Sequence, residues 1–176
     1  PYARTIIVGL LNYHPPEPIA QEDNLILSRY AVTTDYHQVV KKKLEQLAGF
    51  LTGSCGATAT RTFVDSGPVL EKEWARRSGV GWQGKHSLII HPDGGSFFFI
   101  GLLLTDLALA PDEPAADRCQ RCDLCVKACP TGALDTPYRL DVARCIAFHT
   151  IESNEDIPPE IRGKLNRRIY GCDLCQ

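Results

Sequence analysis

The chain has 176 residues and a formal net charge of −2, with 44% hydrophobic and 23% charged residues. These totals are typical of a globular protein made of one ordinary domain and a small appended module. They exclude a strongly basic nucleic-acid binder, so RNA contacts would have to come from a local patch. The longest apolar run, Phe97 to Leu104, is far shorter than the roughly 20 residues that cross a bilayer. No secretory signal opens the sequence, and we expect a cytoplasmic protein with no membrane segment.

Both ends of the sequence look cut. The chain has no methionine, and its first residues lead directly into an apolar run. The last residue, Gln176, follows a cysteine in the middle of a motif. We therefore expect a fragment that is truncated at both ends.

The first part of the chain predicts a strand, a helix and a second strand. Thr5 to Leu11 is a continuous apolar run, which is typical of a strand buried on both faces. From Asp35 the pattern becomes helical, with Thr34 or Asp35 as the cap and an apolar stripe that ends at Leu51. Thr58 to Val64 alternates small, polar and β-branched residues and predicts a strand.

The middle of the chain predicts a turn, a helix and a hairpin. Asp65 to Pro68 is a turn, and Pro68 is expected at the first position of a helix over Val69 to Ser78. Ser87 to His91 and Ser96 to Thr105 are predicted strands, joined by a proline- and glycine-containing hairpin turn.

A segment rich in proline and aspartate, residues 108–117, is predicted to link two modules. The first module, residues 1–107, is mixed α/β with enough apolar surface for its own core. The second module, residues 118–176, has too few large apolar side chains to fold without a metal. The fold class expected for the whole chain is α+β.

Seven of the eight cysteines lie in the last 58 residues. Four of them follow the spacing C-x2-C-x2-C-x3-C-P, at Cys119, Cys122, Cys125 and Cys129. In bacterial ferredoxins the first three thiolates of this run bind one [4Fe–4S] cluster, and the fourth binds the other. Structural zinc sites use cysteine pairs at longer separation, and disulfide scaffolds belong to secreted proteins. The spacing therefore predicts iron–sulfur clusters.

The second cluster has four candidate ligands: Cys129, Cys145, Cys172 and Cys175. The first cluster then lacks a fourth thiolate. The pattern from Cys122 to Cys125 recurs from Cys172 to Cys175, and this echo predicts the missing ligand just beyond residue 176. Cys55, in a loop rich in glycine and serine, is the other candidate, and we expect it to be a bystander thiol.

Several longer motifs resemble those of the epoxyqueuosine reductase family and occur in the same order. They are Ser28–Tyr30, Asp35–His37, Val64–Glu71, Gly81–Ser87, Ser96–Phe99, Leu104–Asp106, Cys129–Ala133, Pro137–Tyr138, Arg144–Ile146 and Arg168–Asp173. The resemblance implies a cobalamin-dependent enzyme that reduces epoxyqueuosine to queuosine at the wobble position of tRNA. It also implies a nitroreductase-like, cobalamin-processing module followed by a ferredoxin-like module. An N-terminal stretch and a C-terminal helical-repeat region would complete the protein.

Asp65 matches the proton donor of that family, and its place between a strand and a helix is usual for a functional group. The structural alternative is a helix cap or an Asx turn. Nine further residues are candidates for contacts with cobalamin: Tyr30, Asp35, Tyr36, His37, Gly84, Lys85, His86, Ser87 and Ile146. Taken singly, a histidine or tyrosine of this kind is more often a packed or surface residue.

The resemblance implies two [4Fe–4S] clusters and cobalamin as cofactors. The expected partners are a tRNA that bears epoxyqueuosine and a flavodoxin- or ferredoxin-like electron donor, with the protein as a monomer. The densest basic stretch contains Arg162, Lys164, Arg167 and Arg168, which would contact tRNA phosphates or form a solvated loop over a negative cluster. Two other functions remain open, a reductive dehalogenase-like corrinoid enzyme and a non-catalytic ferredoxin-type carrier.

Overall fold

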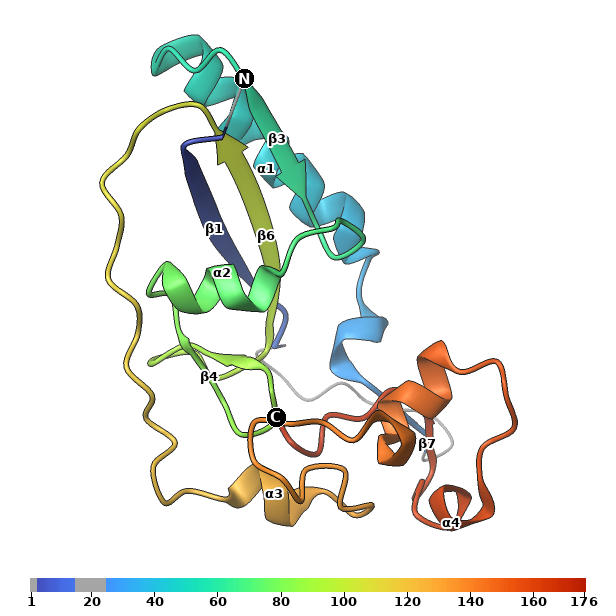
Figure 1. The fold of residues 1–176 in the computed structure, drawn as a ribbon. Coiled ribbons are helices and arrows are strands. Elements are labelled where there is room, and N and C mark those ends of the chain that lie inside the picture. Colours follow the sequence, from blue (N-terminus) through green and yellow to red (C-terminus); the bar gives the residue numbers. More distant parts are fainter. Residues whose placement is uncertain (1–2, 15–24) are drawn as a thin grey trace. The chain divides into compact units, whose positions relative to one another are not determined.

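The computed structural model describes residues 3–14 and 25–176 (Figure 1). The chain is mixed α and β, and it divides into two compact units. The first unit contains the chain up to Tyr13, residues 34–82 and residues 89–117. The described part of the second unit contains residues 14, 25–33, 83–88 and 118–176. Within the described ranges, no helix is long and apolar enough to cross a membrane.

A three-stranded antiparallel sheet forms the centre of the first unit. Its strand order is β1 (Thr5–Asn12), β6 (Phe98–Thr105) and β3 (Thr60–Phe63). Because β6 is central, Leu102 and Leu103 are completely buried. The prediction that the first strand is buried on both faces was wrong, since β1 is a half-buried edge strand paired on one side only in this sheet.

Helix α1 (Tyr36–Ser54) runs along the sheet (Figure 1) and supplies the other half of the core. Val40, Leu44 and Leu51 are buried against Leu103 of β6. Close approach depends on Gly101, because a Cβ atom there would lie 2.7 Å from Cγ1 of Val40. The predicted cap is confirmed: the Asp35 side chain accepts a hydrogen bond from the backbone N–H of His37 at 3.0 Å.

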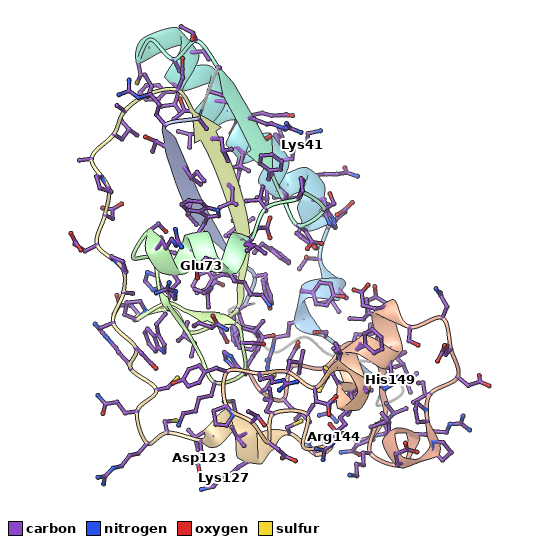
Figure 2. The ribbon with its side chains drawn as sticks, viewed as in Figure 1. Lys41, Glu73, Asp123, Lys127, Arg144 and His149 are labelled. Atoms are coloured by element: carbon purple, nitrogen blue, oxygen red, sulfur yellow. The ribbon has the colours of Figure 1, made fainter. Side chains whose placement is uncertain are left out.

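Helix α2 (Glu71–Arg77) begins later than predicted. Pro68 lies outside the helix, so its expected place at the first helical position was wrong. Glu73 supports the helix by bonding Arg76 at 2.9 Å and Arg77 at 2.7 Å (Figure 2). Both pairs have the three- or four-residue spacing that brings side chains together on a helix.

The predicted hairpin between residues 87 and 105 does not form. The short strand β5 (Ile89–Ile90) pairs instead with β4 (Trp82–Gln83). Strand β6 pairs instead with β1 along its whole length and with β3 over Leu102–Thr105. A single bridge between His91 and Gly95 remains at the expected turn.

The second unit consists of short elements joined by loops. Strand β2 (Ile26–Leu27) pairs in parallel with β7 (Arg168–Tyr170). The helical segments are η2 (Arg29–Val32), α3 (Leu124–Ala128), η3 (Val142–Arg144), η4 (Phe148–Glu152) and α4 (Pro159–Arg162). Its buried apolar residues are few: Cys119, Ala133, Leu134, Ile146 and Ile161. A core this small fits the expectation that the unit depends on metal for stability.

We expect Leu103→Ala to destabilise the protein by about 2–5 kcal/mol, because the truncation leaves a cavity at a completely buried site. Phe50→Ala is the control, since Phe50 lies on α1 with 57% of its surface exposed, and it should change stability by about 0.5 kcal/mol or less. Chemical denaturation followed by circular dichroism measures both. Equal destabilisation by the two variants would contradict the placement of Leu103 in the core.

Candidate functional site

Asp65 lies in a constrained turn directly after β3. Its φ angle is 59°, a left-handed conformation that few residues other than glycine adopt. Its backbone N–H donates to Oε1 of Glu71 at 2.6 Å. Two residues on, a Cβ atom at Gly67 would lie 2.3 Å from Cδ1 of Phe63, so the turn requires glycine there. Contacts on both sides of the turn thus hold the strained backbone in place. The side chain itself is accessible, with 61% of its surface exposed.

Three residues at the start of α1 surround this carboxylate. Tyr36 donates its hydroxyl to Oδ2 of Asp65 at 2.7 Å, and Nε2 of His37 lies 3.3 Å from the same oxygen. The other ring nitrogen, Nδ1, lies 2.8 Å from Oδ1 of Asp35. His37 therefore bridges two carboxylates. Tyr36 is held by stacking on the Phe99 ring, with centroids 4.1 Å apart.

The charges of this group are coupled. The hydrogen bond to Asp35 raises the pKa of His37, and Asp65 adds to the effect in the same direction. The same contact lowers the pKa of Asp35. Burial raises the pKa of Glu71, and the charge of nearby Asp65 also raises it, although the Asp65 N–H acts in the opposite direction. A proton on His37 is therefore favoured next to Asp65.

The seven clustered cysteines fall into two groups in the second unit. Burial raises the pKa of Cys125, and the neighbouring thiols of Cys119 and Cys122 act in the same direction. Burial also raises the pKa of Cys175 to about 12, and the neighbouring thiols act in the same direction: Cys172, Cys145 and Cys129. The two groups contain the same residues as the two ligand sets predicted from the spacing.

These thiols fit iron–sulfur clusters by their chemistry. Within residues 3–14 and 25–176, no three His, Cys, Asp or Glu side chains converge on a point where one metal ion would bind. A cubane cluster does not need such convergence, because each thiolate binds a different iron. Cys55 follows the end of α1 in the other unit and is exposed, so the structure groups it with neither set.

Cys129 is surrounded by hydrogen-bond donors. Its sulfur lies 3.4 Å from Oγ1 of Thr131. Burial would raise its pKa, but the Thr131 hydroxyl and the N–H groups of residues 131–133 outweigh burial and lower it. The turn that aims these groups depends on Gly132, whose φ is 66°. Donors that favour a thiolate are an expected part of the surroundings of an iron–sulfur ligand.

The predicted loop 84–87 belongs to the second unit. Gly84 donates its N–H to the carbonyl of Leu88 at 2.8 Å, and buried His86 accepts from the Leu88 N–H at 3.1 Å. Ser87 has a φ of 64°. The Lys85 ammonium donates to the carbonyls of Gln120 and Cys122 at 2.8 and 2.6 Å. The loop therefore packs on the segment that carries the first group of cysteines.

Tyr30 and Ile146 also belong to the second unit. The Tyr30 ring lies 6.3 Å from that of Tyr170, and burial, then the hydrogen bond to Tyr170, raises its pKa. Ile146 is 2% exposed. The cobalamin contacts predicted for these residues and for the 84–87 loop stay predictions, as do those of Asp35, Tyr36 and His37.

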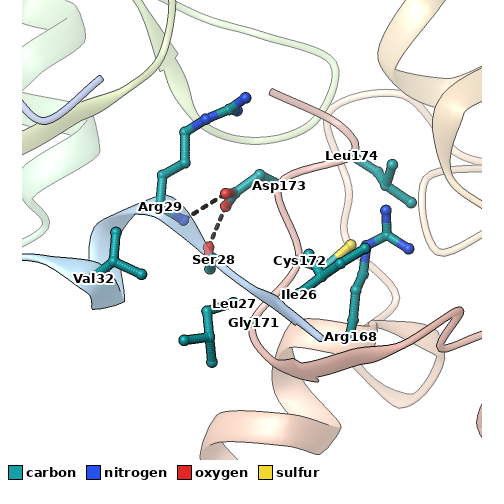
Figure 3. Close-up of a pocket in the computed structure, with 10 residues that line it drawn as sticks. All are labelled: Ile26, Leu27, Ser28, Arg29, Val32, Arg168, Gly171, Cys172, Asp173 and Leu174. Atoms are coloured by element: carbon teal, nitrogen blue, oxygen red, sulfur yellow. Dashed lines mark hydrogen bonds between the residues drawn. The ribbon is translucent and has the colours of Figure 1, made fainter. Parts of the chain in front are cut away.

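Sequence reasoning missed the junction between residues 26–29 and the last cysteine pair (Figure 3). Ser28 donates its hydroxyl to Asp173, and the Arg29 N–H donates to the same carboxylate at 2.7 Å. These residues line a cavity of about 270 Å³ together with Arg168 and Cys172. The motifs Ser28–Tyr30 and Arg168–Asp173 were both noticed, but nothing in a single sequence pairs segments 145 positions apart.

We expect Asp35→Asn to lower the pKa of His37, because it removes the carboxylate that raises it most. A raised histidine pKa stabilises the fold below about pH 6.5 and loses that effect as pH rises through the folded-state value. The contribution is small, since 44% of the His37 side chain is exposed. NMR titration of the imidazole checks this, with Asp93→Asn as the control. An unchanged His37 titration in Asp35→Asn would contradict the assigned contact.

The chain matches two family models. Residues 1–66 match "Epoxyqueuosine reductase QueG, DUF1730", and residues 118–176 match "4Fe-4S double cluster binding domain". Among curated relatives, an epoxyqueuosine reductase of Cellulophaga algicola is 45% identical over 99% of this chain and 56% of its own length. One of Escherichia coli is 46% identical over 85% of this chain and 40% of its own length. The chain thus spans about half the length of these relatives.

Solved structures agree over the whole chain. An epoxyqueuosine reductase with an epoxyqueuosine-modified tRNA-Tyr stem loop superimposes with a TM-score of 0.90, at 35% identity, over 99% of this chain and 47% of that one. The Bacillus subtilis enzyme, with its aspartate catalytic loop swung out of the active site, matches with a TM-score of 0.87 at 34% identity, over 100% of this chain and 48% of that one. The chain belongs to the epoxyqueuosine reductase family.

Proposed function

We propose that the full protein reduces the epoxide of epoxyqueuosine to give queuosine in tRNA, and that this chain supplies the proton donor and the cluster ligands. The observation that carries the proposal is Asp65, held on a strained turn by Tyr36 and His37. A ferredoxin-type carrier needs cluster ligands only and has no use for such a group. Family membership supports the choice over a reductive dehalogenase-like enzyme.

The two groups of cysteines hold two [4Fe–4S] clusters in this proposal, and each cluster passes one electron at a time. Cobalamin, when bound, supplies the chemistry that delivers electrons to the epoxide carbon. The residues proposed to hold it are Tyr30, Asp35, Tyr36, His37, Gly84, Lys85, His86, Ser87 and Ile146.

Loss of the epoxide oxygen as water consumes two electrons and two protons. The departing oxygen is a poor leaving group until it is protonated, and a positioned acid accelerates such a step by about 10²- to 10⁴-fold. Asp65 gives the proton, and His37 resupplies it through Nε2, 3.3 Å away. Asp35 supports this role because it raises the pKa of His37 and so favours the imidazolium.

The tRNA is the proposed partner, and a related enzyme has been solved with a modified tRNA stem loop. Arg162, Lys164 and Arg167 are exposed and available for phosphate contacts. Arg168 is half-buried and donates to the carbonyl of Leu165 at 3.3 Å. A flavodoxin- or ferredoxin-like protein is the proposed electron donor, and we propose that the enzyme works as a cytoplasmic monomer.

Asp65→Asn in the full-length protein should lower the rate of epoxyqueuosine reduction by about 10²- to 10⁴-fold, because the amide cannot donate the proton. The variant should keep its iron and its affinity for cobalamin. Single-turnover assays on tRNA that contains epoxyqueuosine measure the rate, with Asp93→Asn as the control. Wild-type rates in Asp65→Asn would end the assignment of Asp65 as the acid.

Cys145→Ser should remove most of the iron of the second cluster, because a half-buried set of four ligands loses one of them. Cys55→Ser should retain all of it, since Cys55 is exposed and in the other unit. Iron and acid-labile sulfide analysis after anaerobic reconstitution distinguishes them. Loss of iron from Cys55→Ser to the same extent would make Cys55 a ligand.

A further inference from the structure

Lys85 bonds two backbone segments, one within the first group of cysteines and one at Tyr138. Its ammonium donates to the carbonyls of Gln120 and Cys122 at 2.8 and 2.6 Å. Its own carbonyl accepts from the backbone N–H of Tyr138 at 2.9 Å. Lys85 thus makes three hydrogen bonds within the second unit. Two of them go to the loop between Cys119 and Cys122, which we call the ligand loop.

The bonded segments are strained. Gln120 has a φ of 40° and Tyr138 a φ of 66°, which are left-handed values at residues other than glycine. Such conformations persist only where surrounding contacts fix them. Lys85 contacts both residues, so it is placed to hold the loop between Cys119 and Cys122 in the conformation that presents its sulfurs.

The charge of Lys85 has a second consequence. An ammonium bonded to the carbonyl of Cys122 lies next to a residue whose thiolate would bind iron. Reduction adds a negative charge to the cluster, and a fixed positive charge stabilises the reduced form. Both acceptors of Lys85 are neutral carbonyls. Lys127, by contrast, has 72% of its side chain exposed and lies 3.1 Å from the carboxylate of Asp123 (Figure 2), so its charge is screened and partly offset.

We propose that Lys85 is a positioning residue for the first iron–sulfur cluster, which it serves by fixing the ligand loop and raising the reduction potential. The inference rests on the proposed cluster assignment and does not depend on the epoxide chemistry. Because the charge and the donors belong to one side chain, two substitutions test them together: Lys85→Met removes both, and Lys85→Arg keeps both.

The test is a redox titration monitored by electron paramagnetic resonance on the full-length protein, reconstituted anaerobically with iron and sulfide. The Cys145→Ser variant is used to assign the signals: because it weakens the second cluster, the signals that it retains belong to the first. In Lys85→Met the ratio of reduced to oxidised first cluster at a fixed potential should fall about tenfold, equivalent to about 59 mV for one electron. The second cluster should not shift, and Lys85→Arg should lie close to wild type. The matched control, Lys127→Met, should change the ratio less than about twofold.

Unchanged iron content and unchanged potentials in Lys85→Met would overturn the proposal, and so would an equal shift in Lys127→Met. If Lys85→Met loses iron from the first cluster while Lys85→Arg retains it, the loop-fixing role is supported. Loss of iron from both variants would refute a role for the charge. Wild-type protein without two iron–sulfur signals would refute the cluster assignment itself, which separates that failure from a failure of Lys85.

Discussion

The second unit depends on bringing mutually repelling sulfurs together in a segment with a small apolar core. Burial and neighbouring thiols raise the pKa of Cys175 to about 12, so burial without metal favours the neutral form of this thiol. In the proposed holoprotein, iron would replace the protons and supply bonds that the small core cannot, so that the free energy of binding adds to the free energy of folding. Lys85 fixes the first ligand loop, and the pairing of Ser28 with Asp173 fixes the last.

The first unit works differently, because it has a conventional core. The central strand β6, with its completely buried Leu102 and Leu103, and the apolar face of α1 provide this core. That rigid core can hold Asp65 in a left-handed conformation, with Tyr36 stacked on Phe99 beneath it. Packing thereby places the carboxylate that we propose as the acid, with His37 Nε2 3.3 Å away as its proposed proton source. A preorganised acid on a stable scaffold is the arrangement that general acid catalysis requires.

Local signals in the sequence predicted local structure well. The α1 helix with its Asp35 cap, the strands near residues 5 and 60, and the turn at Asp65 are confirmed. The cysteine spacing predicted an iron–sulfur module, and the match to a double-cluster binding domain over residues 118–176 supports it; the division of the ligands between two clusters stays a prediction. The errors came from long-range pairing. The predicted hairpin does not form, and β6 pairs instead with β1 and β3, which are distant from it in sequence.

The same limit explains what was missed. Residues 25–33 and 83–88 were assigned by chain order to the first module, whereas they pack with the cysteine unit. Polar contacts such as those of Lys85 produce no periodic pattern in the sequence. A sequence can therefore indicate that such a residue has a role, but it does not predict which residue it contacts. The contacts of the 84–87 loop are accordingly the part of the site that only the structure shows.

The most direct test is metal analysis of the full-length natural protein, purified anaerobically and examined by Mössbauer spectroscopy. The account predicts iron and acid-labile sulfide in equal amounts, about eight of each per chain, in two [4Fe–4S] clusters. Zinc bound in place of iron, or iron without sulfide, would contradict it.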